Sequence, residues 1–417
     1  MARALLEDLF RAAVKAADSL ESIRPVLPNP PQRGKTVVIG AGKGAAQMAA
    51  ALEALWPGEL SGTVVTRYGY GCATRTIKVL EASHPVPDEA GLVAGQHLVD
   101  LIDGLSENDL VIALVCGGGS ALLPAPPEGL TLADEIHLNE ILLASGAPIS
   151  AMNVVRKHLS TLKGGRLAAL TKARVVSLIV SDIPGDNPAQ VASGPTVPDR
   201  STRQDALDIV ARYRLPLTDA MMAHLHSPQA DAPSPDDAIF ARHEHHVIAS
   251  AGRSLEAAAA LASARGIDAH ILSDSMEGEA RDVAMAHAAI TREIATRNRP
   301  FTRPCLLLSG GETTVTLSGK GGKGGRNGEF ALAFALAVEG LPVTLLAADT
   351  DGIDGTETNA GAFADGETAQ RLRDAGFDGR ALLSGHDSHT GFSAIGDLFI
   401  TGPTGTNVND FRAILIE

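Results

Sequence analysis

The chain has 417 residues, a formal net charge of -14 and 45% hydrophobic residues, of which few are aromatic. This length predicts two or three domains, of which we expect two, with cores large enough to need no cross-links. The acidic charge argues against a nucleic-acid-binding surface, because neutralising phosphates along a groove takes a dense face of lysine and arginine. An Ala-, Leu-, Val- and Gly-rich composition favours an α/β protein with helix-covered parallel sheets.

The N-terminal 20 residues place apolar side chains at helical spacing with acids between them, which predicts an amphipathic packing helix and not a signal peptide. No apolar run reaches the roughly 20 residues that span a bilayer. Both absences lead us to expect a cytoplasmic protein without membrane partners. Cys72, Cys116 and Cys305 lie far apart in the sequence and form no CxxC pair, which predicts reduced, buried thiols and no zinc site.

Short β-branched runs then alternate with Ala/Leu-rich helical stretches, the rhythm of βαβ units and of one mainly parallel sheet per domain. Residues 225–240 combine Pro, Asp and Ser without periodicity, which predicts a linker and hinge. We therefore expect domains at 1–235 and 236–417. The expected strands are 36–40, 63–66, 77–82, 110–116, 175–180, 245–250, 268–273, 305–311 and 343–349.

The turn at residues 40–45 follows the first strand and opens a helix, where free backbone N–H groups hold an anion. Read as GxGxxA through Gly40 and Gly42, it is a dinucleotide fingerprint, but the next strand is followed by Arg67 and not by the acid that binds a ribose hydroxyl. NAD is therefore disfavoured, while NADP stays conceivable. The turn is no Walker A loop, and its Lys43 can reach a phosphate that the glycines hold. A tight turn alone is the alternative.

Two later glycine-rich segments suggest further phosphate contacts. Three glycines end the strand at 110–116, where the backbone can approach a ligand closely and Ser120 can cap the next helix. The segment 318–337 leads through glycine pairs and two lysines to Arg326, placed like the charge clamp of phosphoryl transfer; the alternative is a flexible surface loop. The nucleotide- or phosphate-binding candidates are Gly40, Gly42, Gly117, Gly118, Gly119, Ser120, Gly324, Gly325 and Asn327.

Acidic residues follow two predicted strands, in ADTDGIDG (348–355) and SDIPGDN (181–187). Mg²⁺ prefers one or two carboxylates plus phosphate oxygens, so Asp351 and Asp186 are candidate metal ligands; solvated turn acids are the alternative. Asp182 or Asp186 is the candidate acceptor of a hydroxyl proton. The substrate-binding candidates are Lys43, Ser120, Asp186 and Glu312, and the histidines with a weaker claim to acid/base chemistry are His84, His386 and His389.

Ten motifs of this sequence, and their order along the chain, resemble those of the glycerate 2-kinase family, the class II glycerate kinases with a MOFRL C-terminal domain. They cover nearly the whole chain and together are far more specific than any single glycine loop. The motifs are GAGKGAAQMA (40–49), SHPVPDEAG (83–91), CGGGSALL (116–123), NVVRKHLSTLKGGRLA (153–168), SDIPGDN (181–187), SGPT (193–196), SGGETTV (309–315), GKGGRNGEFALAFA (322–335), ADTDGIDG (348–355) and TGPTGTNVND (401–410).

The resemblance implies a Rossmann-like N-terminal domain, a smaller mixed α/β C-terminal domain with its MOFRL region at about 303–412, and an active site in the cleft between them. It also implies ATP- and Mg²⁺-dependent conversion of D-glycerate to 2-phosphoglycerate, with Lys43 and Arg326 as the essential basic pair and Asp182 as a further catalytic candidate. One departure is GHDSHTGF, where the family usually has a Tyr and a second Phe near His389.

Two rival functions remain at this stage. Some members of the family are labelled hydroxypyruvate reductase, an NAD(P)H-dependent activity that the missing ribose acid disfavours. A non-catalytic nucleotide or sugar-acid sensor would bind ATP without turnover, which the presence of both Lys43 and Arg326 disfavours. The expected partners are small molecules, D-glycerate and ATP; a homodimer is compatible with the sequence, which does not fix the number of subunits.

Overall fold

The computed structural model describes residues 2–317, 319 and 321–417. Ser318 and Lys320, which the predicted glycine-rich segment includes, lie outside the described residues. Within the described ranges, no helix has both the length and the apolar character that crossing a membrane requires. The cysteines are unpaired thiols: Cys116 and Cys305 are buried, as predicted, whereas Cys72 is only half-buried.

The chain forms two compact units. The N-terminal unit comprises Ser19–Ile248, and the C-terminal unit combines Ala249–Glu417 with the segment that ends at Asp18. This division differs from the expected one at 235/236 because strand β6 (Glu244–Ala249) joins the N-terminal sheet and because the first helix packs in the C-terminal unit.

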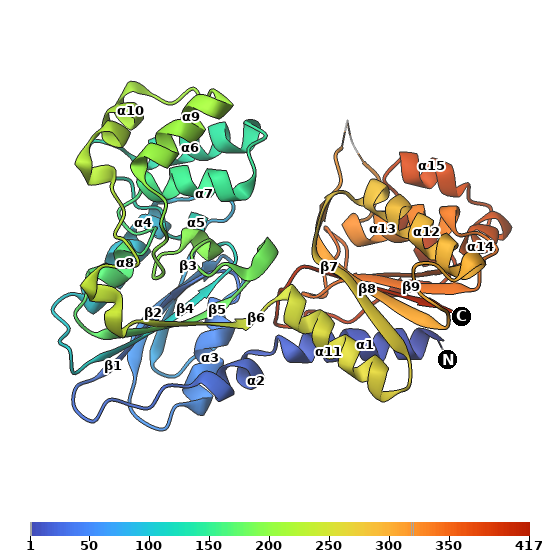
Figure 1. Ribbon diagram of the computed structural model, residues 1–417, viewed down its shortest axis with the longest axis horizontal. Coiled ribbons are helices and arrows are strands. Elements are labelled where there is room, and N and C mark those ends of the chain that lie inside the picture. Colours follow the sequence, from blue (N-terminus) through green and yellow to red (C-terminus); the bar gives the residue numbers. More distant parts are fainter. Residues whose placement is uncertain (1, 318, 320) are drawn as a thin grey trace. The chain divides into compact units, whose positions relative to one another are not determined.

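The N-terminal unit is built on a six-stranded sheet of order β3-β2-β1-β4-β5-β6, in which β1 to β5 pair in parallel. From β1 the chain proceeds outward through β2 to β3 and then returns to the other side of β1 with β4 (Figure 1). The strand order therefore reverses between β1 and β4. The strands before β6 are β1 (Thr36–Ala41), β2 (Ser61–Arg67), β3 (Ile77–Ala82), β4 (Leu110–Cys116) and β5 (Arg174–Val180).

Helices cover this sheet, and four of them, α6, α7, α9 and α10, form a separate apolar cluster beyond it (Figure 1). The helices are α2 (Ser19–Ile23), α3 (Ala45–Leu55), α4 (Glu89–Ile102), α5 (Gly119–Leu122), α6 (Leu132–Ala144), α7 (Ile149–His158), α8 (Arg166–Ala169), α9 (Arg203–Tyr213) and α10 (Asp219–His226). Short 3-10 turns are η1 (Arg24–Val26), η2 (Pro184–Asp186), η3 (Val191–Ser193), η4 (Pro228–Ala230) and η5 (Ala238–Arg242).

The expected linker at 225–240 is part of the N-terminal unit, so its prediction as a hinge is wrong. Arg166 donates hydrogen bonds to the backbone carbonyls of Ala230 (2.8 Å) and Asp231 (3.0 Å), and Arg200 forms an ion pair with Asp236. These contacts attach the segment to the N-terminal unit, and short backbone turns such as η4 satisfy part of its own backbone. The chain passes between the units at 18/19 and 248/249.

The C-terminal unit contains a mixed six-stranded sheet of order β11-β10-β9-β12-β8-β7, in which only β7 and β8 pair in parallel. The mainly parallel sheet that the βαβ rhythm predicted is wrong here, whereas the mixed α/β C-terminal domain that the family resemblance implied is confirmed. The last strand of the chain, β12, enters the middle antiparallel to both neighbours. The strands are β7 (Asp268–Glu279), β8 (Cys305–Thr314), β9 (Val343–Asp349), β10 (Gly361–Asp365), β11 (Leu398–Phe399) and β12 (Asp410–Ile416).

Helices cover both faces of this sheet (Figure 1). The predicted amphipathic helix is α1 (Ala2–Ala16), which buries Leu6, Leu9 and Phe10 with α11 against one face. The other face carries α12 and α13, and the buried Phe330 and Phe334 of α13 fill the space above the strands. The remaining helices are α11 (Ala251–Ala264), α12 (Ala280–Arg297), α13 (Arg326–Ala337), α14 (Thr368–Asp374), α15 (Gly379–Ser384) and α16 (Ser388–Ala394).

Candidate active site

The turn after β1 and the glycine loop after β4 meet at the reversal of strand order in the N-terminal unit. The Lys43 N–H donates to the Gly117 carbonyl (2.8 Å), and Thr66 Oγ1 donates to the Lys43 carbonyl (3.0 Å). Open parallel sheets bind ligands outside the carboxyl ends of the strands at such a reversal. The two predicted glycine loops therefore lie at the position where this fold places a ligand, with Lys43 between them.

Glycine is required at two points of these loops because other chain segments pass too closely for a side chain. Gly42 has a positive φ of 142°, and a Cβ there would overlap Cys116. A Cβ at Gly117 would overlap the carboxylate of Asp182, which follows β5. The same close approach brings Asp182 against the glycine loop, so Lys43, Asp182 and the three glycines, all predicted site residues, come together.

His84 lies in the same group. A Cβ at Gly118 would lie 3.0 Å from the His84 ring and 3.1 Å from Lys43 Cγ, so both side chains border this glycine. Burial, together with the positive charges of Lys43 and Arg67, lowers the pKa of His84 to about 4. His84 is therefore a neutral imidazole at physiological pH. Burial raises the pKa of the neighbouring Cys116 thiol to about 12, which keeps it protonated and unreactive.

We expect the His84 ring to stay neutral down to about pH 5 and to protonate only near pH 4. Replacing Lys43 with alanine should raise the His84 pKa, because one of the two cations that disfavour imidazolium is removed, but burial should still hold it below about 6.5. Long-range ¹H–¹⁵N correlation spectra of the histidine rings measure both values. A wild-type His84 that titrates near 6.5 would contradict the buried, cation-flanked environment.

Ser120 does not cap the short helix α5 as expected. No side chain caps this helix, and the Ser120 hydroxyl instead lies 3.0 Å from the hydroxyl of Ser193. Ser193 Oγ donates in turn to Asn153 Oδ1 (3.1 Å). Sequence reasoning missed the last two residues, although both occur in motifs of the family, because only the folded chain brings η3 and α7 to the glycine loop.

A second group of predicted residues forms around Arg326, the first residue of α13, in the C-terminal unit. Its guanidinium binds three carboxylates: Asp410 through Nε (2.7 Å), Asp349 through Nη2 (2.6 Å) and Glu312 through Nη1 (2.8 Å). Burial alone would lower the pKa of Arg326, but Asp410, Asp349 and Glu312 together raise it. Asp349 and Asp410 are buried, whereas Glu312 is 52% exposed, so the Nη1 edge is the one that faces solvent.

The pKa values of the two buried acids of this group are shifted in opposite directions. Burial raises the pKa of Asp349 well above its ordinary value, and the Arg326 charge opposes this only in part. For Asp410, burial also favours the neutral form, but Arg412 and Arg326 lower its pKa below the ordinary value. Asn327 Nδ2 donates to Asp410 Oδ1 (2.8 Å). Sequence reasoning assigned no role to Asp410 or Arg412; an aspartate and arginine two apart in an otherwise apolar strand were the available signal.

Asp354, the last aspartate of the ADTDGIDG motif, caps helix α13. Its carboxylate accepts the backbone N–H groups of Asn327 (2.9 Å) and Gly328 (2.8 Å) at the helix start. Burial raises the pKa of Asp354 to about 6, while these two hydrogen bonds lower it. A carboxylate committed to a helix terminus is poorly placed to bind a metal.

Replacing Asp354 with alanine should destabilise the C-terminal unit by about 1–2 kcal/mol, the cost of a lost helix cap. A folded-state pKa near 6 means that the folded chain binds this proton more tightly than the unfolded chain. Stability from Asp354 therefore decreases as pH rises from about 4 to 6, and this part of the pH dependence should disappear in the variant. Hydrogen exchange of α13 peptides between pH 4 and 7, corrected for intrinsic rates, measures both effects. Unchanged protection at every pH would exclude the capping role.

The described part of the predicted cationic loop is fixed at several points. Gly322 N–H donates to the Gly385 carbonyl (2.9 Å), and Lys323 N–H donates to Asp387 Oδ1 (2.9 Å). The His389 N–H donates to the Lys323 carbonyl (3.0 Å). Gly324 and Gly325 follow and lead directly into α13. These bonds contradict the alternative of an unattached surface loop for residues 322–325.

The two candidate metal ligands belong to different units of the chain. Asp351 follows β9, and its Oδ1 accepts the N–H of Ile353 (2.8 Å). Asp186 ends η2, half-buried, in the left-handed region at a φ of 51°. The described residues contain no group of three or more His, Cys, Asp or Glu side chains with the geometry of a metal site.

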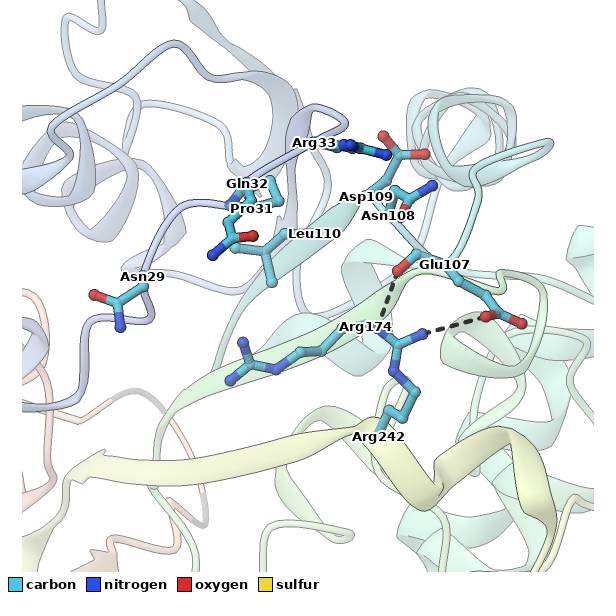
Figure 2. Close-up of a pocket in the computed structure, with 10 residues that line it drawn as sticks. All are labelled: Asn29, Pro31, Gln32, Arg33, Glu107, Asn108, Asp109, Leu110, Arg174 and Arg242. Atoms are coloured by element: carbon cyan, nitrogen blue, oxygen red, sulfur yellow. Dashed lines mark hydrogen bonds and ion pairs between the residues drawn. The ribbon is translucent and has the colours of Figure 1, made fainter.

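A separate pocket of about 440 Å³ opens at the amino-terminal ends of β4 and β5, the opposite end of these strands from the glycine loops (Figure 2). Two of its three arginines are engaged by protein groups: Arg174 pairs with Glu244, and Arg242 donates to the Glu107 carbonyl. None of the predicted site residues lines it. The lining residues are Asn29, Pro31, Gln32, Arg33, Glu107, Asn108, Asp109, Leu110, Arg174 and Arg242.

The fold and the loops define an α/β protein that presents two glycine-rich turns, one of them bearing a lysine, at the switch point of a parallel sheet. Residues 5–226 match the "Domain of unknown function (DUF4147)" model, and residues 305–410 match the MOFRL family. The chain therefore belongs to the family of glycerate kinases that combine these two domains, as its motifs predicted.

Three relatives illustrate this membership. A glycerate 2-kinase of Pyrococcus horikoshii is 42% identical over 92% of this chain and 88% of its own. The crystal structure of a glycerate kinase from Thermotoga maritima superposes with a TM-score of 0.89 at 37% identity, covering 99% of both chains. A protein of Agrobacterium vitis that is provisionally named a hydroxypyruvate reductase is 49% identical over 100% of this chain and 94% of its own.

Proposed function

We propose that the protein transfers the terminal phosphoryl group of ATP to D-glycerate and forms 2-phosphoglycerate. The observation that carries this proposal is the lysine at the switch point: Lys43 lies between two glycine loops whose backbone can approach an anion. Full-length similarity to proteins named glycerate 2-kinase supports the same substrate and product.

Phosphoryl transfer depends on positioning and on charge neutralisation more than on covalent chemistry. In our proposal the Lys43 ammonium and the Arg326 guanidinium bind the transferring group, and the exposed Nη1 edge of Arg326 exchanges Glu312 for a phosphate oxygen. Asp182, held against Gly117, accepts the proton of the attacking hydroxyl. The glycine loops at 117–119 and 321–325 hold the other phosphates or the glycerate carboxylate.

Mg²⁺ is usually held by one or two carboxylates, by waters and by the substrate phosphates. In our proposal Asp351 or Asp186 is the carboxylate that would hold the ion, with its remaining ligands from waters and substrate phosphates. The bound ion would neutralise phosphate charge beside Lys43 and Arg326.

One experiment tests the proposal and its rival together. Purified protein is given Mg-ATP and D-glycerate, with coupling enzymes that consume either 2-phosphoglycerate or 3-phosphoglycerate; in parallel it is given NADH or NADPH and hydroxypyruvate. We expect ATP-dependent signal only with the 2-phosphoglycerate couple. The reductase rival is disfavoured because β2 ends in Arg67, which stacks on Tyr70, where a dinucleotide site requires an acid. Oxidation of the nicotinamide without phosphorylation would reverse the assignment.

A further inference from the structure

The hydroxyl of Ser120 takes part in a chain of hydrogen bonds whose direction can be worked out. Asn153 Nδ2 donates to the Gln190 carbonyl (3.2 Å), and Asn153 Oδ1 accepts from Arg156 Nη1 (3.2 Å). A carbonyl can only accept and a guanidinium can only donate, so these two partners fix which end of the Asn153 amide is the oxygen. That oxygen faces Ser193 Oγ at 3.1 Å.

The orientation of Asn153 determines the direction of both serine protons. A serine hydroxyl has one proton, and Ser193 must direct it to Asn153 Oδ1, because two acceptors would otherwise face each other at 3.1 Å. Ser193 Oγ therefore accepts the proton of Ser120, 3.0 Å away. The Ser120 oxygen is left with lone pairs only, and among the described residues no group donates to them.

The fold holds this arrangement rigidly. Ser193 is 1% exposed and Asn153 is 4% exposed, so neither can exchange its partner for water. Ala192 and Ser193 both adopt left-handed backbone conformations, with φ of 51° and 60°, which cost roughly 1–3 kcal/mol each in residues other than glycine. The strained turn is what presents Ser193 Oγ to the glycine loop.

We propose that Ser120 is a specificity-determining residue whose Oγ accepts a hydrogen bond from a hydroxyl group of the bound acid. This rests on the proposed function, because the ligand is the hydroxy acid that the enzyme phosphorylates. Phosphate and carboxylate oxygens are acceptors at neutral pH and would face the lone pairs of Ser120 without a proton between them. The phosphate-binding role expected for Ser120 is thereby replaced by recognition of a substrate hydroxyl.

The test uses Ser120→Ala and three acids: D-glycerate, D-lactate, which lacks the terminal hydroxyl, and 3-hydroxypropionate, which lacks the internal one. Calorimetry in the presence of a non-hydrolysable ATP analogue measures the affinity of each. Ser120→Ala should weaken D-glycerate binding on the order of 10-fold. One of the two analogues should bind both proteins equally, since it lacks the hydroxyl that Ser120 recognises, and affinity for the nucleotide analogue should not change.

Two further variants separate recognition from packing. Ser193→Ala removes the acceptor of the Ser120 proton, so Ser120 can then donate a hydrogen bond as well as accept one. The difference in affinity between D-glycerate and the analogue that lacks the recognised hydroxyl should therefore decrease. Ser177→Ala is the matched control, because it removes a buried hydroxyl pair with Thr196 (2.8 Å) away from the glycine loop. It should leave all three affinities unchanged.

The outcomes distinguish this inference from the proposed function. Phosphorylation of D-glycerate by the wild type, with affinity unaltered in Ser120→Ala, would leave the function standing and overturn the role of Ser120. An equal loss for all three acids, or a loss of nucleotide affinity, would also overturn it. Hydroxyl-dependent binding of D-glycerate without phosphorylation would support Ser120 and reject the kinase. No binding of D-glycerate to the wild type would reject both.

Discussion

Replacing Lys43 with alanine is expected to lower the kcat for glycerate phosphorylation by about 10²-fold or more while the N-terminal unit stays folded. The ammonium would neutralise charge on the transferring phosphoryl group, and Lys43 is the lysine that lies at Gly117 and Gly118. The fold should survive because the structural bonds of Lys43 use its backbone: the N–H binds Gly117 and the carbonyl binds Thr66.

The coupled 2-phosphoglycerate assay measures the effect, and fluorescence of Trp56, the one tryptophan of the chain, reports whether the N-terminal unit is folded. Lys35→Ala is a suitable control, since Lys35 is an exposed lysine just before the other end of the same strand and should retain wild-type turnover. Lys43→Arg keeps the positive charge but replaces the compact ammonium with a larger, planar guanidinium, so its kcat should lie between those of Lys43→Ala and the wild type. Near-wild-type kcat for Lys43→Ala would remove this residue from the chemistry.

The residues that meet at the reversal of strand order in the N-terminal sheet could be predicted from the sequence, because each lies in a motif of a few consecutive residues. All nine expected strands are present, and glycine-rich turns that directly follow apolar strands of a βαβ pattern can lie only at the carboxyl edge of a parallel sheet. Lys43, Gly117 and Asp182 were each identified from such turns. Their mutual contacts follow from the sheet order, which the strand rhythm alone does not specify.

The group around Arg326 could be predicted only in part from the sequence, because the carboxylates that bind Arg326 come from strands distant in the sequence. Asp410 opens β12, which was not expected as a strand and pairs with β8 and β9. Antiparallel insertion of a C-terminal strand breaks the βαβ rhythm, so no local pattern predicts it. The hydrogen-bond chain from Ser120 through Ser193 to Asn153 was missed for the same reason, because these residues lie on different segments. The direction of its protons depends in addition on Arg156 of α7.

Replacing Arg326 with alanine is expected to abolish activity and to destabilise the C-terminal unit by about 3–5 kcal/mol, the usual cost of removing one partner of a buried ion pair. Asp410 and Asp349 would remain buried, and Asp410 would keep only Arg412 as a counter-charge. Arg326→Lys restores the positive charge, but an ammonium cannot bind the three carboxylates as the guanidinium does. This variant should therefore recover part of the stability and little of the activity.

The deficit should shrink as pH falls from 7 toward about 4. In the wild type, the lowered pKa of Asp410 means that its stabilising contribution is present above its unfolded pKa and is lost as pH falls through the lower folded value. In Arg326→Ala the pKa of Asp410 should rise, because the charge that favours the carboxylate is gone, and acidification then neutralises the buried acid. Between pH 7 and about 4 the change in the variant reduces the difference between the two proteins, and the change in the wild type reduces it further only at lower pH.

Hydrogen exchange of peptides from α13 and β12 measures this loss directly, because the tryptophan and all three tyrosines, Tyr68, Tyr70 and Tyr213, lie in the N-terminal unit. Trp56 fluorescence should accordingly be unchanged in the variant. Arg373→Ala removes an exposed surface ion pair with Glu339 in the same unit and should have no measurable effect on exchange or turnover. Wild-type protection in Arg326→Ala at neutral pH would mean that Asp349 and Asp410 are already neutral without it, and Arg326 would then act on the phosphoryl group alone.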